Sequence, residues 1–423
     1  MLWRYSVRET ESENLSVKLF KPTKHAKETS TIVGTANDPL SDTDSVLDGN
    51  SHNSWYRVLR RPQWIWQGVE AIEMEETLAR IAASDNTRSN DKLLDTVVGY
   101  RSGNWPYEWT QTGTSHQKKA QLKEEQGDKK GAFIDWLRAS TCFSIAGYPH
   151  LKGDPLSQQT EILANKAFHF AMEKSPFKIK SVVTKVDGKS LEGFLYLPHT
   201  DEPLPTVIVS GSLDSLQTDL WHLFETYFAP ANIAMLTLDM PSVGRSSAWK
   251  LTEDSSRLHQ AMLHELETVP WVDHHRVGCL GVRFGANAAV RMAFVEQNRI
   301  KSCVSVGGIL HAMLTDPQRL QHIPPMHLDT IASRMGKDSA SFSLLTQLQA
   351  LSLRHQGLLN GRKTKVPILA LGLQGDPVCP ESDNQLAALY SYGGKARTLP
   401  NKPIHDGYHR IMLEAIEWFT NTL

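Results

Sequence analysis

At residues 281–285 the chain reads Gly281-Val282-Arg283-Phe284-Gly285, directly after the apolar run Val277–Leu280. Two glycines at this spacing allow the backbone to turn sharply from a strand into a helix, and the turn lifts the central side chain above the sheet. The frame is that of a nucleophile elbow, G-x-S-x-G, with arginine in place of serine. A guanidinium stays protonated at any usable pH, so Arg283 cannot be the attacking nucleophile. The motif therefore predicts the fold more clearly than it predicts the chemistry.

Strand and helix patterns alternate on both sides of this turn. An antiparallel hairpin is expected around Asp187-Gly188, because Ile179–Val186 and Leu191–Leu197 flank that turn signal. The apolar runs that follow alternate with helical patterns and are Thr206–Val209, Ile233–Leu238, Val277–Leu280, Cys303–Val306 and Ile368–Leu373. This order predicts an α/β-hydrolase fold over residues 178–423, with a doubly wound, mostly parallel sheet.

The N-terminal half of the chain has a different pattern. Residues 1–50 are rich in Ser, Thr, Asp and Asn and predict an extended or partly disordered arm. Residues 51–177 predict a helical N-terminal domain, and its helical patterns are Val69–Ala83, Asp91–Tyr100, His116–Ile145 and Leu156–Lys174. At 423 residues the chain is long enough for two domains, which supports this division.

Composition excludes several classes of function. The formal net charge is −1, so we expect no general attraction to nucleic acid or to an anionic membrane. No run approaches the roughly 18 apolar residues of a membrane span, and the N-terminus lacks the apolar core of a secretory signal. The four cysteines are widely spaced, which favours free thiols in a reducing compartment over a disulfide framework or a metal site. We therefore expect a cytoplasmic protein without a bound metal.

Ligands of open α/β sheets bind beyond the carboxyl ends of the strands. The loop that follows Val209 begins Ser210-Gly211-Ser212-Leu213-Asp214 and should lie at this edge. In hydrolases such a loop donates one N–H of the oxyanion hole, and the residue after the nucleophile donates the other. Ser212, Leu213 and Phe284 are therefore the predicted oxyanion or substrate-binding residues.

Two further residues are candidates for a catalytic triad. Asp376 follows the apolar run Ile368–Leu373, where a hydrolase presents its acid, and it would orient an imidazole. The alternative is that Asp376 caps a turn. His405 lies shortly before the last helical pattern and is the predicted base, with His409 as the second choice among 17 histidines.

The role of Arg283 has three interpretations. The nucleophile can come from elsewhere, either as activated water or from a nearby serine, the candidates being Ser210, Ser212, Ser215, Ser242 and Ser246. Alternatively, the planar guanidinium binds a carboxylate or phosphate of the substrate through two hydrogen bonds. In the third interpretation, Arg283 pairs with Asp376 and closes an inactive site.

Several motifs resemble the fermentation–respiration switch (FrsA) family of esterases. They are Trp55-Tyr56-Arg57, Trp64-Ile65-Trp66, Gly103-Asn104-Trp105, Tyr148-Pro149-His150-Leu151-Lys152-Gly153-Asp154, Leu213-Asp214-Ser215-Leu216-Gln217-Thr218-Asp219, Asp239-Met240-Pro241-Ser242-Val243-Gly244 and Arg283-Phe284-Gly285-Ala286-Asn287. The resemblance runs from about Leu15 to the C-terminus and includes the arginine of the elbow. Ser212 departs from the glycine expected in its loop, and the resemblance does not extend to His405.

The resemblance implies a helical domain on an α/β-hydrolase domain and an esterase that acts on simple short-chain esters. It also implies possible binding to the glucose-specific IIA component of the phosphotransferase system, and a link to the control of fermentation versus respiration. We expect neither an organic cofactor nor a metal. Two alternatives stay open at this point: a cofactor-free lyase in which Arg283 holds a small 2-oxo acid, and a non-catalytic regulatory binding protein with a hydrolase fold.

Overall fold

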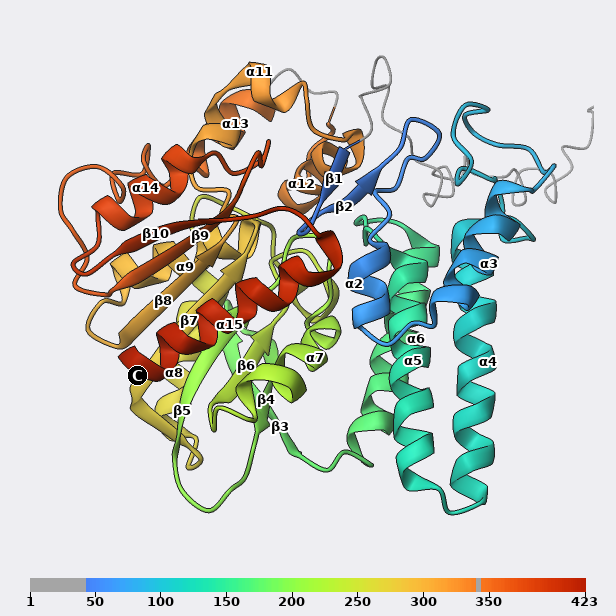
Figure 1. Ribbon diagram of the computed structural model, residues 1–423, viewed down its shortest axis with the longest axis horizontal. Coiled ribbons are helices and arrows are strands. Elements are labelled where there is room, and N and C mark those ends of the chain that lie inside the picture. Colours follow the sequence, from blue (N-terminus) through green and yellow to red (C-terminus); the bar gives the residue numbers. More distant parts are fainter. Residues whose placement is uncertain (1–42, 340–343) are drawn as a thin grey trace, which may run out of the picture.

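The computed structural model describes residues 43–339 and 344–423, and the larger part of the predicted N-terminal arm lies outside these ranges. Figure 1 shows a layer of long helices beside a twisted sheet that carries helices on both faces. Within these ranges, no helix is long and apolar enough to span a membrane.

The helical layer contains α2 (Arg61–Trp66), α3 (Ala71–Ala82), α4 (Trp105–Glu125), α5 (Lys129–Gly147) and α6 (Pro155–Met172). The long helices begin at side chains that accept backbone N–H groups: Asn104 accepts the N–H of Tyr107, and Asp154 those of Leu156 and Ser157. Trp64, Trp105 and Trp109 pack against one another in the core of this layer, with ring centroids 5.7–6.1 Å apart.

Two helical predictions in this layer need correction. The predicted helix at 116–145 is interrupted, because α4 ends at Glu125 and α5 begins at Lys129 after the Asp128 cap. The predicted helix at 91–100 is wrong, since this segment consists of turns. Thr96 donates its hydroxyl to the backbone carbonyls of Asn90 and Leu93, and Asp95 accepts the backbone N–H groups of Tyr56 and Arg57. Short polar side chains of this kind stabilise turns at the expense of a helix.

The predicted sheet is confirmed as an eight-stranded sheet in the order β10-β9-β8-β7-β5-β6-β4-β3. The strands are β3 (Lys178–Val186), β4 (Lys189–Leu197), β5 (Leu204–Ser210), β6 (Ala234–Leu238), β7 (Val272–Val282), β8 (Ile300–Val306), β9 (Ile368–Leu373) and β10 (Lys395–Leu399). β3 and β4 form the predicted antiparallel hairpin, and β4 pairs antiparallel with β6. The remaining pairs are parallel, so the carboxyl ends of β5, β7, β8 and β9 meet at one edge.

Helices cover both faces of this sheet (Figure 1). They are α7 (Trp221–Leu223) with the π-helical turn Phe224–Phe228, α8 (Arg257–Glu265), α9 (Phe284–Val295), α14 (Glu381–Leu389) and α15 (Ile404–Thr422). Alternate residues of a strand point to opposite faces. Val207 and Val209 of β5 accordingly pack in one core cluster with α7 and α15, whereas Ile208 packs in the other with α8 and α9.

Short helices interrupt the alternation between β8 and β9. They are α10 (Ala312–Thr315), α11 (Pro317–Leu320), α12 (Pro325–Met335) and α13 (Leu344–Ala350). The described part of the N-terminal arm is a hairpin of β1 (Thr43–Ser45) and β2 (Gly49–Ser51). The tip of this hairpin is buried, and the N–H of Val46 donates to Asn401 just before α15. The arm and α12 both reach the carboxyl edge of the sheet, from distant parts of the chain.

Candidate active site

The turn between β7 and α9 has the geometry of a nucleophile elbow. Arg283 lies at its apex with φ 54° and ψ −115°, a positive φ that is uncommon outside glycine. The flanking glycines are required by close backbone contacts. A Cβ on Gly281 would lie 2.2 Å from the carbonyl of Gly285, and a Cβ on Gly285 would lie 2.4 Å from the carbonyl oxygens of Ser210 and Gly211.

The Arg283 guanidinium is buried and surrounded by acceptors. Its Nε donates to Oδ1 of Asp48 at 2.9 Å, and its Nη2 donates to Oδ2 of the same carboxylate. Its Nη1 donates to Oδ2 of Asp376 at 2.6 Å and to the carbonyl of Gly307 at 3.1 Å. The remaining N–H faces the hydroxyl of Ser45 at 3.5 Å. All five guanidinium donors therefore face protein groups, and none is left for an external anion in this arrangement.

Asp48 and Asp376 hold the charge of Arg283 in a buried triad. Burial alone would lower the pKa of Arg283, but the two carboxylates more than offset it and raise that pKa. Burial likewise acts to raise the pKa of Asp48, and the charge of Arg283 overcomes this and lowers it. Arg283 and Asp48 are therefore both charged at neutral pH.

The structure brings Asp376 to Arg283, and among the described side chains it pairs with no imidazole. Oδ1 of Asp376 accepts the backbone N–H groups of Val378 and Cys379 at 2.9 and 3.2 Å, so this residue also caps its turn. His405 is the second residue of α15, in the first turn of the helix. The second choice, His409, faces Tyr227, with Nδ1 3.0 Å from the hydroxyl.

Ser212, Leu213 and Phe284 do come together. They line a cavity of about 40 Å³ beside Arg283. Phe284 is the first residue of α9, so its N–H has no acceptor within the helix. Over residues 43–339 and 344–423, the backbone N–H groups of these three residues donate to no protein acceptor. An oxyanion hole consists of such unused backbone N–H groups, and here one lies at a helix N-terminus and two lie in the loop after β5.

His327 of α12 lines the same cavity and was not anticipated from the sequence. Its Nδ1 lies 3.8 Å from Oδ2 of Asp214, which is longer than a hydrogen bond. Its Nε2 is buried without a partner among the described residues. Burial lowers the pKa of His327 below its ordinary value, although Asp48 and Asp214 act in the opposite direction. A neutral imidazole with a free nitrogen can accept a proton.

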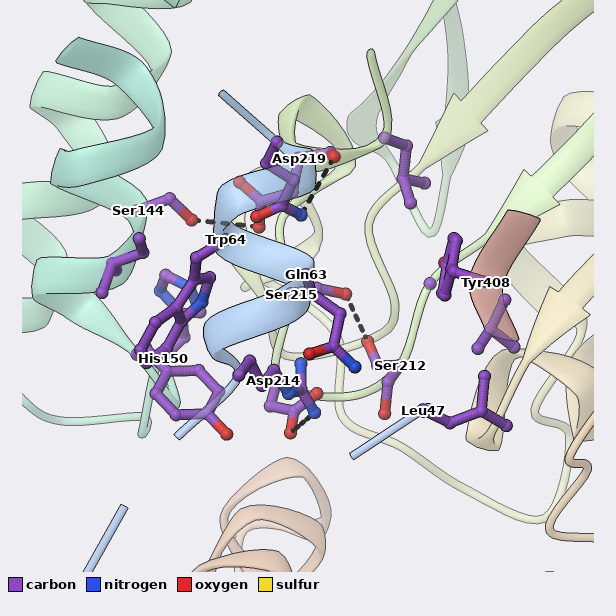
Figure 2. Close-up of a pocket in the computed structure, with 17 residues that line it drawn as sticks. Leu47, Gln63, Trp64, Ser144, His150, Ser212, Asp214, Ser215, Asp219 and Tyr408 are labelled. Carbon is purple, nitrogen blue, oxygen red and sulfur yellow. Dashed lines mark hydrogen bonds and ion pairs between the residues drawn. The ribbon is translucent and has the colours of Figure 1, made fainter. Parts of the chain in front are cut away.

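A second cavity, of about 70 Å³, lies between the helical layer and the sheet (Figure 2). Ser212 and Asp214 line both cavities, so the two are neighbours. Arg60, which lines the second cavity, donates from Nη2 to Oδ2 of Asp214 at 2.7 Å. Four buried polar atoms of residues lining this cavity have no hydrogen-bond partner in the described part of the chain: Arg60 Nε, Gln63 Oε1, His150 Nδ1 and Asp214 Oδ1. Of these, His150 Nδ1 lies 3.3 Å from the carboxylate of Glu161.

The serines that could replace the missing nucleophile are placed differently. Ser212 and Ser215 line the second cavity, and Ser215 donates its hydroxyl to the carbonyl of Ser212. Ser210 lies 2.5 Å from Nε2 of His259, a buried Ser–His pair whose members line neither cavity. Ser242 and Ser246 are buried and also line neither cavity.

Asp239 has a structural role in the turn that follows β6. Asp239 accepts the backbone N–H groups of Gln217 and Arg245, and a Cβ on Gly244 would lie 2.5 Å from its carboxylate. The four cysteines are buried free thiols. In the described ranges, no three side chains of His, Cys, Asp or Glu form a metal-binding group.

The sequence of this chain is similar to those of known proteins. A family model described as Esterase FrsA-like matches residues 10–423. The chain is 55% identical over 416 residues to an Esterase FrsA of Photobacterium profundum, covering 98% of this chain and 99% of that one. It is 50% identical over 416 residues to an Esterase FrsA of Vibrio cholerae, with the same coverage.

Solved structures show the same fold at low sequence identity. A 2,6-dihydroxy-pseudo-oxynicotine hydrolase superposes with a TM-score of 0.68 at 19% identity, over 86% of this chain and 95% of that one. AbyA5 superposes with a TM-score of 0.64 at 18% identity, over 84% and 95% of the two chains. These likenesses extend over the helical layer as well as the sheet.

Proposed function

The chain belongs to the FrsA-like esterase family, and from this premise we propose that it hydrolyses small carboxylic esters in the cavity beside Arg283. One observation carries the proposal: Ser212, Leu213 and Phe284, whose backbone N–H groups have no acceptor among the described residues, line the same largely apolar cavity. Such donors stabilise the oxyanion that forms when an ester carbonyl is attacked. The active site thus keeps the electrostatic part of a hydrolase although its elbow has no hydroxyl.

Water is the proposed nucleophile, with His327 as the base. The water oxygen attacks the acyl carbon while Nε2 of His327 takes a proton, and the carbonyl oxygen becomes the oxyanion. When the intermediate collapses, the bond to the alcohol oxygen breaks and His327 returns the proton to it. A carboxylic acid and an alcohol leave. His405 is the alternative base, proposed from its place at the start of α15.

Arg283 and Asp376 are proposed to act on the site indirectly. Since the Arg283 donors are taken by protein groups, its charge would fix the cavity wall and add a positive potential near the oxyanion. A lyase that holds a 2-oxo acid through Arg283 would need the two N–H groups that Asp48 occupies. This contact favours hydrolysis over the lyase alternative.

The regulatory role is a proposal that rests on the family resemblance. It comprises a cytoplasmic location, a link to carbon metabolism and the control of fermentation versus respiration, and binding to the glucose-specific IIA component of the phosphotransferase system. Pull-down with the purified IIA component tests the last of these directly. Binding by a variant that hydrolyses no ester would favour the non-catalytic alternative.

The proposed function is tested with purified protein and 4-nitrophenyl butyrate. We expect turnover above that of an empty-vector preparation, and no labelling by a fluorophosphonate probe, because no serine attacks. If a peptide is labelled, the serine in that peptide is the nucleophile in place of water. Turnover equal to the empty-vector preparation would end the proposal.

A further inference from the structure

The two neighbouring cavities differ in chemistry. The cavity beside the elbow has apolar side chains on its walls, including those of Ile309, Met313 and Val378. Its volume of about 40 Å³ corresponds to three or four waters, since one buried water needs roughly 10–15 Å³. An unbranched acyl chain of two to four carbons is about the size that fits such a space.

The second cavity is built for hydroxyl groups. Arg60 Nε is an unused donor, and Gln63 Oε1 and Asp214 Oδ1 are unused acceptors within the described residues. Figure 2 shows that Gln63 comes from α2, while Ser212 and Asp214 come from the loop on the other side of the cavity. Buried polar groups are costly unless they find partners. A hydroxyl both donates and accepts, so it is a group that can pair with an unused donor and with an unused acceptor.

Charge argues for a neutral occupant. Arg60 is already paired with Asp214 at 2.7 Å. Asp219, which also lines the cavity, accepts the hydroxyl of Ser144 and the N–H of Leu216. A charged ligand would therefore be buried without a free counterion, at a high desolvation cost. The volume of about 70 Å³ holds about five to seven waters at roughly 10–15 Å³ each, close to the number of heavy atoms in glycerol.

We propose that the substrate is a short-chain acyl ester of a small polyhydroxylated alcohol, with the acyl group beside the elbow and the polyol between Gln63 and Asp214. This inference rests on the proposed function. The ester bond would cross the boundary formed by Ser212 and Asp214, next to the oxyanion N–H groups. The division of the site into an apolar and a polar part thus assigns each half of the substrate to a place.

Two substrates with the same skeleton test the inference. Glyceryl 1-monobutyrate and n-propyl butyrate differ by two hydroxyl groups, and released butyrate is measured for both. We expect kcat/KM to be at least about tenfold higher for the glyceryl ester, because a site with unpaired polar groups rejects an analogue that lacks the hydroxyls. Equal kcat/KM values would overturn the inference and leave the proposed function intact. Absence of turnover with these esters and with 4-nitrophenyl butyrate would overturn both.

Two variants test which cavity causes the preference for the glyceryl ester. Gln63→Met keeps the size of the side chain and removes its polar atoms, so the ratio of the two kcat/KM values should fall towards one. Met313→Ala enlarges the acyl cavity and should shift the preference towards longer acyl chains while leaving that ratio in place. The inference would be overturned if the ratio of kcat/KM for the glyceryl and propyl esters fell in Met313→Ala and stayed unchanged in Gln63→Met. The hydroxyl groups would then be recognised in the cavity beside the elbow. The wild-type ratio decides the matter even if Gln63→Met fails to fold.

Discussion

The carboxylate of Asp48 forms a two-point pair with the guanidinium of Arg283, although 235 residues separate them in the chain. The pair joins the tip of the β1–β2 hairpin to the apex of the elbow. Arg283 is thereby fixed between the N-terminal arm and the turn after β9, where Asp376 lies. The elbow of this protein is completed by a segment outside the hydrolase fold.

Removing the Arg283 charge should destabilise the protein more than it changes its chemistry. In Arg283→Met two carboxylates remain buried without a counterion, and breaking a buried ion pair in this way costs about 3–5 kcal/mol. The free energy of unfolding in urea measures the loss. The matched control is the triple variant Arg283→Met, Asp48→Asn, Asp376→Asn, which removes all three charges and should recover much of the loss. A single variant as stable as wild type would contradict the triad.

Replacing His327 should lower kcat without unfolding the protein. Loss of a general base typically costs about 10²–10⁴-fold in rate. We expect such a fall in His327→Gln, whereas His409→Gln changes a residue at the Tyr227 contact and should stay within a few-fold of wild type. His405→Gln, measured beside them, decides between the two bases. A large fall in His405→Gln with normal turnover in His327→Gln would move the base to α15.

The activity should rise with pH through an apparent pKa below 6.5. Burial lowers the pKa of His327, so the neutral form that accepts a proton persists to lower pH than for a free imidazole. The charged groups that face it are Asp48 of the hairpin, Asp214 of the loop after β5, Arg60 before α2 and Arg283 at the elbow. The profile of kcat/KM against pH shows this limb. If the rise of kcat/KM with pH is the same in His327→Gln as in wild type, another group causes that rise.

Removing Asp48 should open an anion site. In Asp48→Ala the Nε and Nη2 groups of Arg283 lose their acceptor and face the cavity, where a carboxylate can replace Asp48. Butyrate should then inhibit the variant at least about tenfold more strongly than wild type, if the new pair contributes roughly 1.4 kcal/mol. Inhibition constants measure this, with the exposed Asp201→Ala as control. Equal inhibition constants would show that the guanidinium stays closed to ligands.

The buried Ser210–His259 pair should make stability depend on pH. Burial lowers the pKa of His259 from 6.5 to about 4, so between these values the unfolded chain binds a proton that the folded protein does not. The stabilisation is complete above pH 6.5 and is lost as the pH falls towards 4, by up to about 3 kcal/mol. His259→Gln keeps an acceptor for Ser210 but does not titrate. The difference in unfolding free energy between the variant and wild type should therefore change over this range in favour of the variant.

The sequence predicted the sheet and its elbow because both depend on local patterns. Gly281 and Gly285 are needed where two backbones approach within contact distance, and their spacing shows it. Asp376 was found because the carboxyl ends of parallel strands share one edge. Arg283 could be located but not interpreted, since its partners decide what it does.

Asp48 and His327 could not be found in the same way. Asp48 lies in a polar arm without periodicity, and its contact with Arg283 spans 235 residues. His327 belongs to the short helices between β8 and β9. This stretch interrupts the alternation of strands and helices, so the sequence pattern does not predict where its residues lie relative to the sheet. The turns of 91–100 were mistaken for a helix because the hydrogen bonds of Thr96 and Asp95 compete with helix formation and leave little mark on the apolar pattern.

The positive φ at Arg283 and its two carboxylates have a consequence for how such a site can evolve. A single mutation that places serine at the apex would leave the two acids beside it without their shared counterion, so a first step towards a serine enzyme would destabilise the protein. Descendants of this chain are thereby held to the arginine unless positions 48 and 376 change with it. The ion cluster of Arg283, Asp48 and Asp376 therefore opposes the replacement of Arg283 alone.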